Sequence, residues 1–147
     1  MRRQRILLAR LLWAPATALC LCAPVRADLV VVGGDGAAGA KLTRDDVINI
    51  YMGRYRAFPD GRPAHPLDAA RNSAERERFY RLLLKKSPGE VQAYWARLVF
   101  SGRTRPPREL PDVHALTGEL DSDPLAIAYV ERKDVTRRMQ ILFFLEP

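Results

Sequence analysis

The sequence predicts a single α/β domain in which a small, largely buried mixed sheet is flanked by helices. A short β-branched run over residues 29–32 reads as a buried strand. Two further apolar runs, at 126–130 and 139–145, have the length of strands. The segments between them carry apolar residues at helical spacing, and strands separated by helices are typical of this fold class. We expect three or four core strands.

The first 27 residues have the three-part form of a secretory signal peptide. A positive region without acids precedes an apolar stretch over residues 11–23, and the small residues Val25 and Ala27 suit a cleavage site after Ala27. A retained membrane anchor is the alternative, but the stretch is shorter than the roughly 20 residues that span a bilayer. We therefore expect a signal peptide at 1–27, one domain at 28–147, and no stable membrane insertion after cleavage.

Removal of the signal peptide changes the charge and the cysteine content. Five of the 24 basic residues and none of the 17 acidic residues lie in the first 27, so residues 28–147 carry a formal net charge of +2. A role in binding nucleic acid thereby loses its main support. Cys20 and Cys22 also lie in the signal segment, which leaves the domain without a disulfide or a thiolate ligand.

The first half of the domain is expected to run strand, loop, helix, turn, strand. A glycine-rich connector over 33–39 follows the first strand. Thr43 stands at the N-cap position of a helix that ends at Gly53. Residues 59–61 have proline-then-glycine turn chemistry and lead to a short strand around 64–67.

The second half is expected to contain three helices before the last two strands. In the first of these helices, residues 75–78 are expected to face water. Ser87, followed by proline, begins the next helix. The proline-rich, basic segment 103–111 is expected to be an irregular surface connection, and 113–120 a short helix.

No residue pattern indicates catalysis or a metal site. His65 and His114 are the only histidines, and neither has a helical i, i+4 partner. The carboxylates show no spacing that distinguishes an acid/base pair from a solvated face. We expect a protein that is not an enzyme and uses no cofactor or metal.

The start of the helix after residue 70 is the candidate binding site. Free N–H groups at a helix N-terminus, the Ser73 hydroxyl and the Arg71 guanidinium could together hold an anion. The alternative is that Ser73 or Asn72 only caps the helix and Arg71 is solvated. The candidate ligand-binding residues are Ser73, Asn72, Arg71, Ala74, Glu75 and, at a second helix start, Thr43.

Four short segments in order give the chain a family resemblance: LT with VINIYMGR at 42–54, FPDG at 58–61, a serine-capped helix with FY at 79–80, and DPLAIAYV at 123–130. In these segments the chain resembles the periplasmic phosphate-binding proteins of ABC importers. The resemblance implies one lobe of the type II periplasmic-binding-protein fold, whose full-length members close two lobes on a ligand. Ser73 matches the family's anion-binding serine, whereas Asp68 stands where the family has arginine.

The resemblance also implies a function. It suggests a non-enzymatic periplasmic substrate-binding protein that takes phosphate or another oxyanion and works with an ABC transporter. The alternative is a periplasmic interaction or regulatory module that uses the same lobe without binding a small molecule. Such a module would dock an envelope protein or a second copy of itself, with Arg103, Arg105 and Arg108 as candidate contacts.

Overall fold

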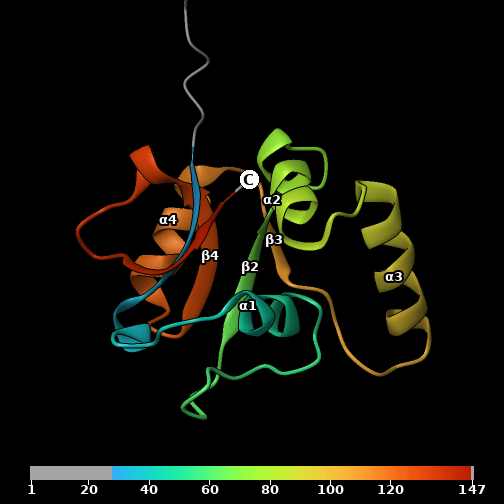
Figure 1. Cartoon of the computed structure of the whole chain (residues 1–147), viewed down its shortest axis with the longest axis horizontal. Helices are drawn as coiled ribbons and strands as arrows, with labels where there is room; N and C mark the ends of the chain where they lie inside the picture. The colour runs from blue at the N-terminus through green and yellow to red at the C-terminus, as the bar shows by residue number, and fades with distance from the viewer. Residues whose placement is uncertain (1–27, 147) are drawn as a thin grey trace, which may run out of the picture.

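The computed structural model describes residues 28–146, so the predicted signal peptide lies outside the described residues. The strands are β1 (Leu29–Gly33), β2 (His65–Ala69), β3 (Arg108–Leu110), β4 (Ala126–Glu131) and β5 (Gln140–Leu145). The helices are α1 (Arg44–Tyr51), α2 (Ala74–Leu84), α3 (Pro88–Phe100) and α4 (Val113–Ser122), with short 3₁₀ turns at Asp35–Ala37 and Arg132–Asp134 (Figure 1).

The strands form one mixed sheet in the order β3-β2-β4-β1-β5. β2 runs parallel to β3 and β4, whereas β1 is antiparallel to β4 and β5. The predicted α/β class is confirmed, and all five residues of β1 are buried, as its β-branched run predicts. The sheet has one strand more than expected, because three residues of the segment predicted to be irregular form β3. A three-residue strand after two prolines is too short to show a period in the sequence.

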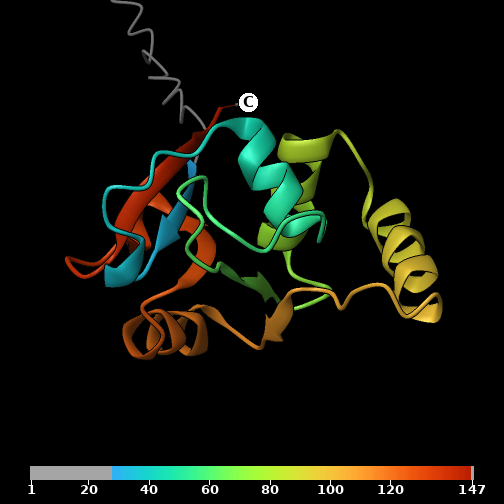
Figure 2. The same cartoon turned by 90° about the horizontal axis from the view of Figure 1, so that it is seen from below.

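The helices cover both faces of this sheet. Figure 2 shows α1 and α2 on one face, α4 on the other, and α3 beyond α2 at the end of the molecule. On the first face the rings of Phe79 and Tyr129 stack with centroids 3.8 Å apart, and Tyr51 meets Phe79 edge-on at 4.7 Å. None of the helices in residues 28–146 has the length and hydrophobicity that a membrane span requires.

Side-chain caps set the helix starts. Thr43 and Ser87 each form a capping box at the beginning of α1 and α3, and Ser73 caps α2 by accepting a hydrogen bond from the Arg76 N–H at 3.2 Å. These three predicted starts are confirmed. Each cap satisfies backbone donors that have no partner within the helix.

Arg76 corrects the prediction that residues 75–78 all face water. The residue is only 6% exposed, and its Nε lies 2.9 Å from the Asp68 carboxylate. Asp68 itself is 1% exposed within β2, and a buried carboxylate needs a charged or hydrogen-bonding partner. Arg76 is this partner, and it lies on the buried face of α2 together with Phe79, Tyr80 and Leu83. A polar side chain is therefore buried here because it pairs with a buried charge.

Candidate functional site

A pocket of about 440 Å³ opens at the edge of the sheet where the parallel strands β2, β3 and β4 end. We call it the edge pocket. Ligands of open α/β sheets commonly bind outside the carboxyl ends of parallel strands. Its lining residues are Ala69, Ala70, Ser73, Glu75, Pro111, Asp112, Val113, Leu116, Tyr129, Val130, Glu131, Lys133 and Asp134.

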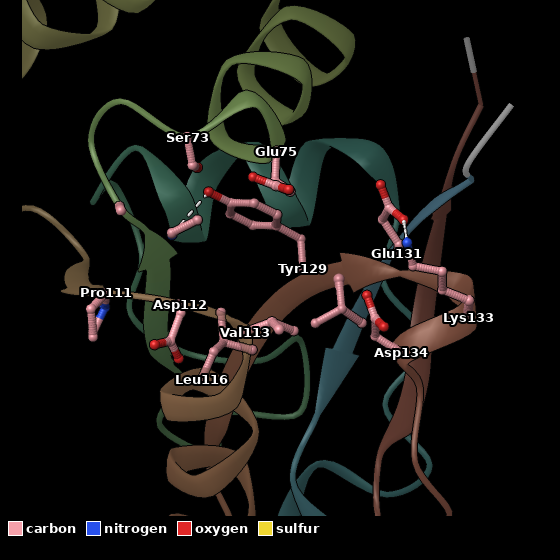
Figure 3. A pocket seen from close by; sticks show the side chains of 13 residues that line it. Ser73, Glu75, Pro111, Asp112, Val113, Leu116, Tyr129, Glu131, Lys133 and Asp134 are labelled. Atoms are coloured by element: carbon pink, nitrogen blue, oxygen red, sulfur yellow. Dashed lines mark hydrogen bonds and ion pairs between the residues drawn. The ribbon is translucent and has the colours of Figure 1, made fainter.

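Two helices begin at the edge pocket, on opposite sides of it. Figure 3 shows Ser73 and Glu75 from the start of α2 near Tyr129, with Val113 and Leu116 of α4 across the opening. The N-terminus of a helix carries a partial positive charge and backbone N–H groups without helical partners. Two such ends at one pocket favour a ligand group with negative charge.

The caps of these two helices leave part of this donor set available. The Ser73 hydroxyl oxygen accepts from the Arg76 N–H, and a carboxylate oxygen of Asp112 accepts from the Ala115 N–H at 2.8 Å. A side-chain cap satisfies one of about four donors at a helix start. The remaining first-turn N–H groups of α2 and α4 can therefore donate to a ligand.

Beneath the opening lies a buried polar cluster centred on Asp68. Its carboxylate accepts hydrogen bonds from the hydroxyls of Tyr80, at 2.9 Å, and Tyr129, besides the one from Arg76. The Tyr129 hydroxyl in turn accepts from the Ala69 N–H at 3.1 Å, which fixes its position in the pocket (Figure 3). Asp68 thus receives hydrogen bonds from three side chains.

Burial and charge shift the pKa values in this cluster. Burial first, and then the neighbouring Asp68 carboxylate, raise the pKa of Tyr80 and of Tyr129 far above the ordinary tyrosine value. Both phenols therefore stay protonated and act as donors at neutral pH. For Arg76, burial opposes the charge, but the attraction of Asp68 outweighs it and raises the pKa of the guanidinium.

The rim of the edge pocket is acidic. Glu75, Asp112, Glu131 and Asp134 contribute four carboxylates, and Lys133 is the only basic residue of the lining. Lys133 Nζ lies 2.7 Å from Glu131, whose carboxylate raises the pKa of the lysine, with smaller effects from Asp134 and Glu75. The pocket thus combines helix ends that favour an anionic group with carboxylates that repel a second negative charge.

The predicted site residues lie in different places. Ser73 and Glu75 line the edge pocket, while Asn72 and Ala74 stand at the same helix start without lining it. Arg71 is directed to β3, where its guanidinium lies 3.2 Å from Glu109.

Thr43 belongs to another part of the molecule. It caps α1 through a reciprocal pair of hydrogen bonds with Asp46 and is not among the residues that line the edge pocket. Its role in the described structure is to begin a helix.

Of the residues that line the edge pocket, the sequence predicted only Ser73 and Glu75; Asp112 and Tyr129 are two of the polar residues that it missed. Asp112 caps α4, and its place directly before the predicted helix at 113–120 was a usable indication. Tyr129 carried no such indication, because its hydroxyl meets Asp68 and Ala69 only through the pairing of distant segments. Among residues 28–146, no group of three or more His, Cys, Asp or Glu side chains could hold a metal ion.

The architecture is that of one lobe of the phosphate-binding proteins with a periplasmic-binding-protein fold. An ABC-type phosphate transport receptor from Vibrio cholerae matches with a TM-score of 0.60 and 13% identity over 78% of this chain. A protein from Clostridium perfringens, assigned as a phosphate ABC transporter substrate-binding protein and solved with bound phosphate, matches with a TM-score of 0.62 and 14% identity, also over 78%.

This chain spans less than half of each of those proteins, 45% and 44% of their lengths. At such identities the likeness shows the fold alone. No protein-family model matches the sequence, and no curated protein is similar to it in sequence.

Proposed function

We propose that the protein is an exported, non-enzymatic binding protein whose edge pocket holds a small polar ligand through an oxyanion group. The observation that carries the proposal is the meeting of two helix N-termini at the carboxyl ends of three parallel strands. The fold likeness to two phosphate transport proteins supports it. Phosphate is the first ligand to test, and an ABC transporter of the cell envelope is the proposed partner.

The first turn of α2 supplies the contacts in this proposal. The N–H groups of Ala74 and Glu75 and the Ser73 hydroxyl donate to the oxyanion, while Asn72 and Arg71 stand beside them at the helix start. Arg71 would contribute its charge once its ion pair with Glu109 is broken. Exposed ion pairs of this kind contribute at most about 1 kcal/mol, so breaking it costs little.

The acidic rim narrows the choice of ligand. The carboxylates of Glu75 and Asp134 repel a dianion but accept a hydrogen bond from a protonated oxygen. A singly charged oxyanion that still bears an O–H group, such as dihydrogen phosphate, therefore suits the edge pocket better than sulfate.

Calorimetric titration with phosphate and then with sulfate, at low salt, tests the proposal together with a thermal-shift measurement. We expect saturable phosphate binding that raises the melting temperature and that is stronger at pH 6 than at pH 8. The absence of a response to either anion would refute an oxyanion-binding pocket.

Two serine caps provide a matched pair of variants. Ser73→Ala and Ser87→Ala each remove a helix cap and each costs about 1 kcal/mol of stability. Only Ser73 lines the edge pocket, so only Ser73→Ala should weaken phosphate binding. Equal affinities in the two variants would place the ligand elsewhere.

A second candidate is an interaction module without a small ligand. It is favoured by two apolar residues at the end of α3, Val99 and Phe100, which are 51% and 96% exposed. Exposed apolar side chains of this kind are available to a protein contact. Sedimentation analysis of the wild type and of Phe100→Ser, together with a pull-down of envelope proteins, tests this function. A wild-type protein that is a monomer at every concentration and retains no envelope protein would exclude it.

A further inference from the structure

A second cavity of about 510 Å³ lies at the opposite end of β2 from the edge pocket, where β2 and β3 begin. We call it the arginine groove. It is lined by Arg56, Pro63, Ala64, His65, Pro66, Leu67, Arg105, Pro106, Pro107, Arg108, Glu119 and Asp123. None of these residues lines the edge pocket, so the two sites are separate.

The charges of the arginine groove are unequally matched. Arg108 pairs with Glu119 at 2.6 Å, and the His65 ring nitrogen lies 2.7 Å from Asp123. Both carboxylates of the lining therefore already have a partner. Within residues 28–146, no carboxylate lies within ion-pair distance of Arg56 or Arg105. The groove therefore has two guanidinium groups whose charge is not paired with a carboxylate of the described residues and can pair with an anionic partner.

The walls of the groove are held in place. The Arg56 guanidinium donates to the Thr104 hydroxyl at 3.2 Å and to the backbone carbonyl of Arg105, which ties the proline-rich segment to the chain before β2. Four of the lining residues are prolines, whose ring restricts backbone rotation. A groove that is ordered before binding loses less conformational entropy when a partner enters.

We infer that the arginine groove binds an extended acidic segment of a partner protein, with carboxylates of that segment paired to Arg56 and Arg105. The charge of the groove complements such a segment, and its volume exceeds what one carboxylate would fill. β3, which begins at Arg108, is an edge strand of the sheet, so an extended peptide beside the groove has a strand edge to follow. This inference does not depend on the edge pocket or on its ligand.

Fluorescence anisotropy of a labelled hexaglutamate peptide tests the inference on the purified protein. We expect saturable binding at about 20 mM salt that weakens at least tenfold at about 300 mM, because exposed charges are screened. A hexaglutamine peptide should not bind. Equal binding of both peptides, or no binding of hexaglutamate at low salt, overturns the inference.

Single substitutions locate the site. The Arg105 side chain is exposed, so Arg105→Ala should keep the fold and weaken hexaglutamate binding about three- to fivefold. The double variant with Arg56→Lys and Arg105→Ala should weaken hexaglutamate binding about tenfold. Arg137→Ala, another exposed arginine outside the groove, is the matched control and should bind as the wild type does.

Two further measurements distinguish a peptide-binding groove from a small-anion site and from the edge pocket. Free glutarate should bind far more weakly than hexaglutamate; equal affinity would mean a small-anion site and would overturn the peptide assignment. Ser73→Ala should leave hexaglutamate binding unchanged, because Ser73 does not line the arginine groove. Loss of peptide binding in Ser73→Ala, with Arg105→Ala unaffected, would also overturn it.

Discussion

The buried pair of Asp68 and Arg76 offers the sharpest test of how this lobe is held together. The side chains are 2% and 8% exposed, so neither charge is well solvated. Arg76→Met keeps an unbranched apolar side chain but removes the guanidinium, which leaves the carboxylate with only the hydroxyls of Tyr80 and Tyr129 as donors. Removal of one partner of a buried ion pair costs about 3–5 kcal/mol, which is a large part of the total stability of about 5–15 kcal/mol of a typical domain.

A double-mutant cycle isolates the interaction itself. Asp68→Asn removes the negative charge and should also destabilise the protein, because Arg76 is then buried without its partner. The double variant, with both changes, buries no unpaired charge, so its loss of stability should be smaller than the sum of the two single losses. We expect a coupling free energy of about 1–3 kcal/mol.

The assay is urea unfolding at pH 7 followed by circular dichroism, for the wild type, the two single variants and the double variant. Arg78→Met serves as the control, since this arginine lies on the same helix but is 36% exposed and 4.0 Å from its carboxylate partner Glu131. It should change the free energy of unfolding by no more than about 0.5 kcal/mol. If Arg76→Met is equally mild, or if the two single effects simply add, then the pair does not anchor α2 to the sheet.

The remaining predictions concern pH and backbone geometry. Burial and then Asp68 raise the pKa of Tyr80 and Tyr129 in the folded protein. Their contribution to the free energy of unfolding is therefore complete below about pH 10 and falls above it, because the tyrosines of the unfolded chain lose their protons there. The loss is about 1.4 kcal/mol per pH unit for each tyrosine. The tyrosinate absorbance contributed by Tyr80 and Tyr129 should therefore rise together with unfolding; titration of both phenols near pH 10 in a still folded protein would contradict this. Gly53 has φ +69°, and an added Cβ would lie 2.8 Å from the Trp95 ring, so Gly53→Ala should lose about 2–3 kcal/mol. Gly61→Ala, at φ +87° with open space around the added carbon, should lose only about 1 kcal/mol, and equal losses in thermal melts would argue against the contact with the indole.

Some features of the site could be predicted because they depend on neighbouring residues. The hydroxyls of three capping residues, Thr43, Ser73 and Ser87, each accept a hydrogen bond from the backbone N–H three residues later. Because this contact is local, the starts of these helices can be predicted from the sequence. The β-branched run of β1 predicts a buried strand, because every one of its side chains is apolar.

Other features follow only from segments that are far apart in the chain. The contact between Tyr129 and Asp68 joins residues 61 positions apart, and it exists because β2 and β4 pair in parallel. The same pairing brings the starts of α2 and α4 to one edge and makes the edge pocket.

The α/β class, the helix starts and the choice of Ser73 as a candidate contact could be predicted from the sequence, since they depend on local hydrogen bonds and on apolar periodicity. The burial of Arg76 against Asp68, the pairing of Arg71 with Glu109 and the carboxylates around the pocket became visible only in the folded protein. The environment of a charge depends on which strands pair, and strand pairing is a long-range property that local pattern does not encode.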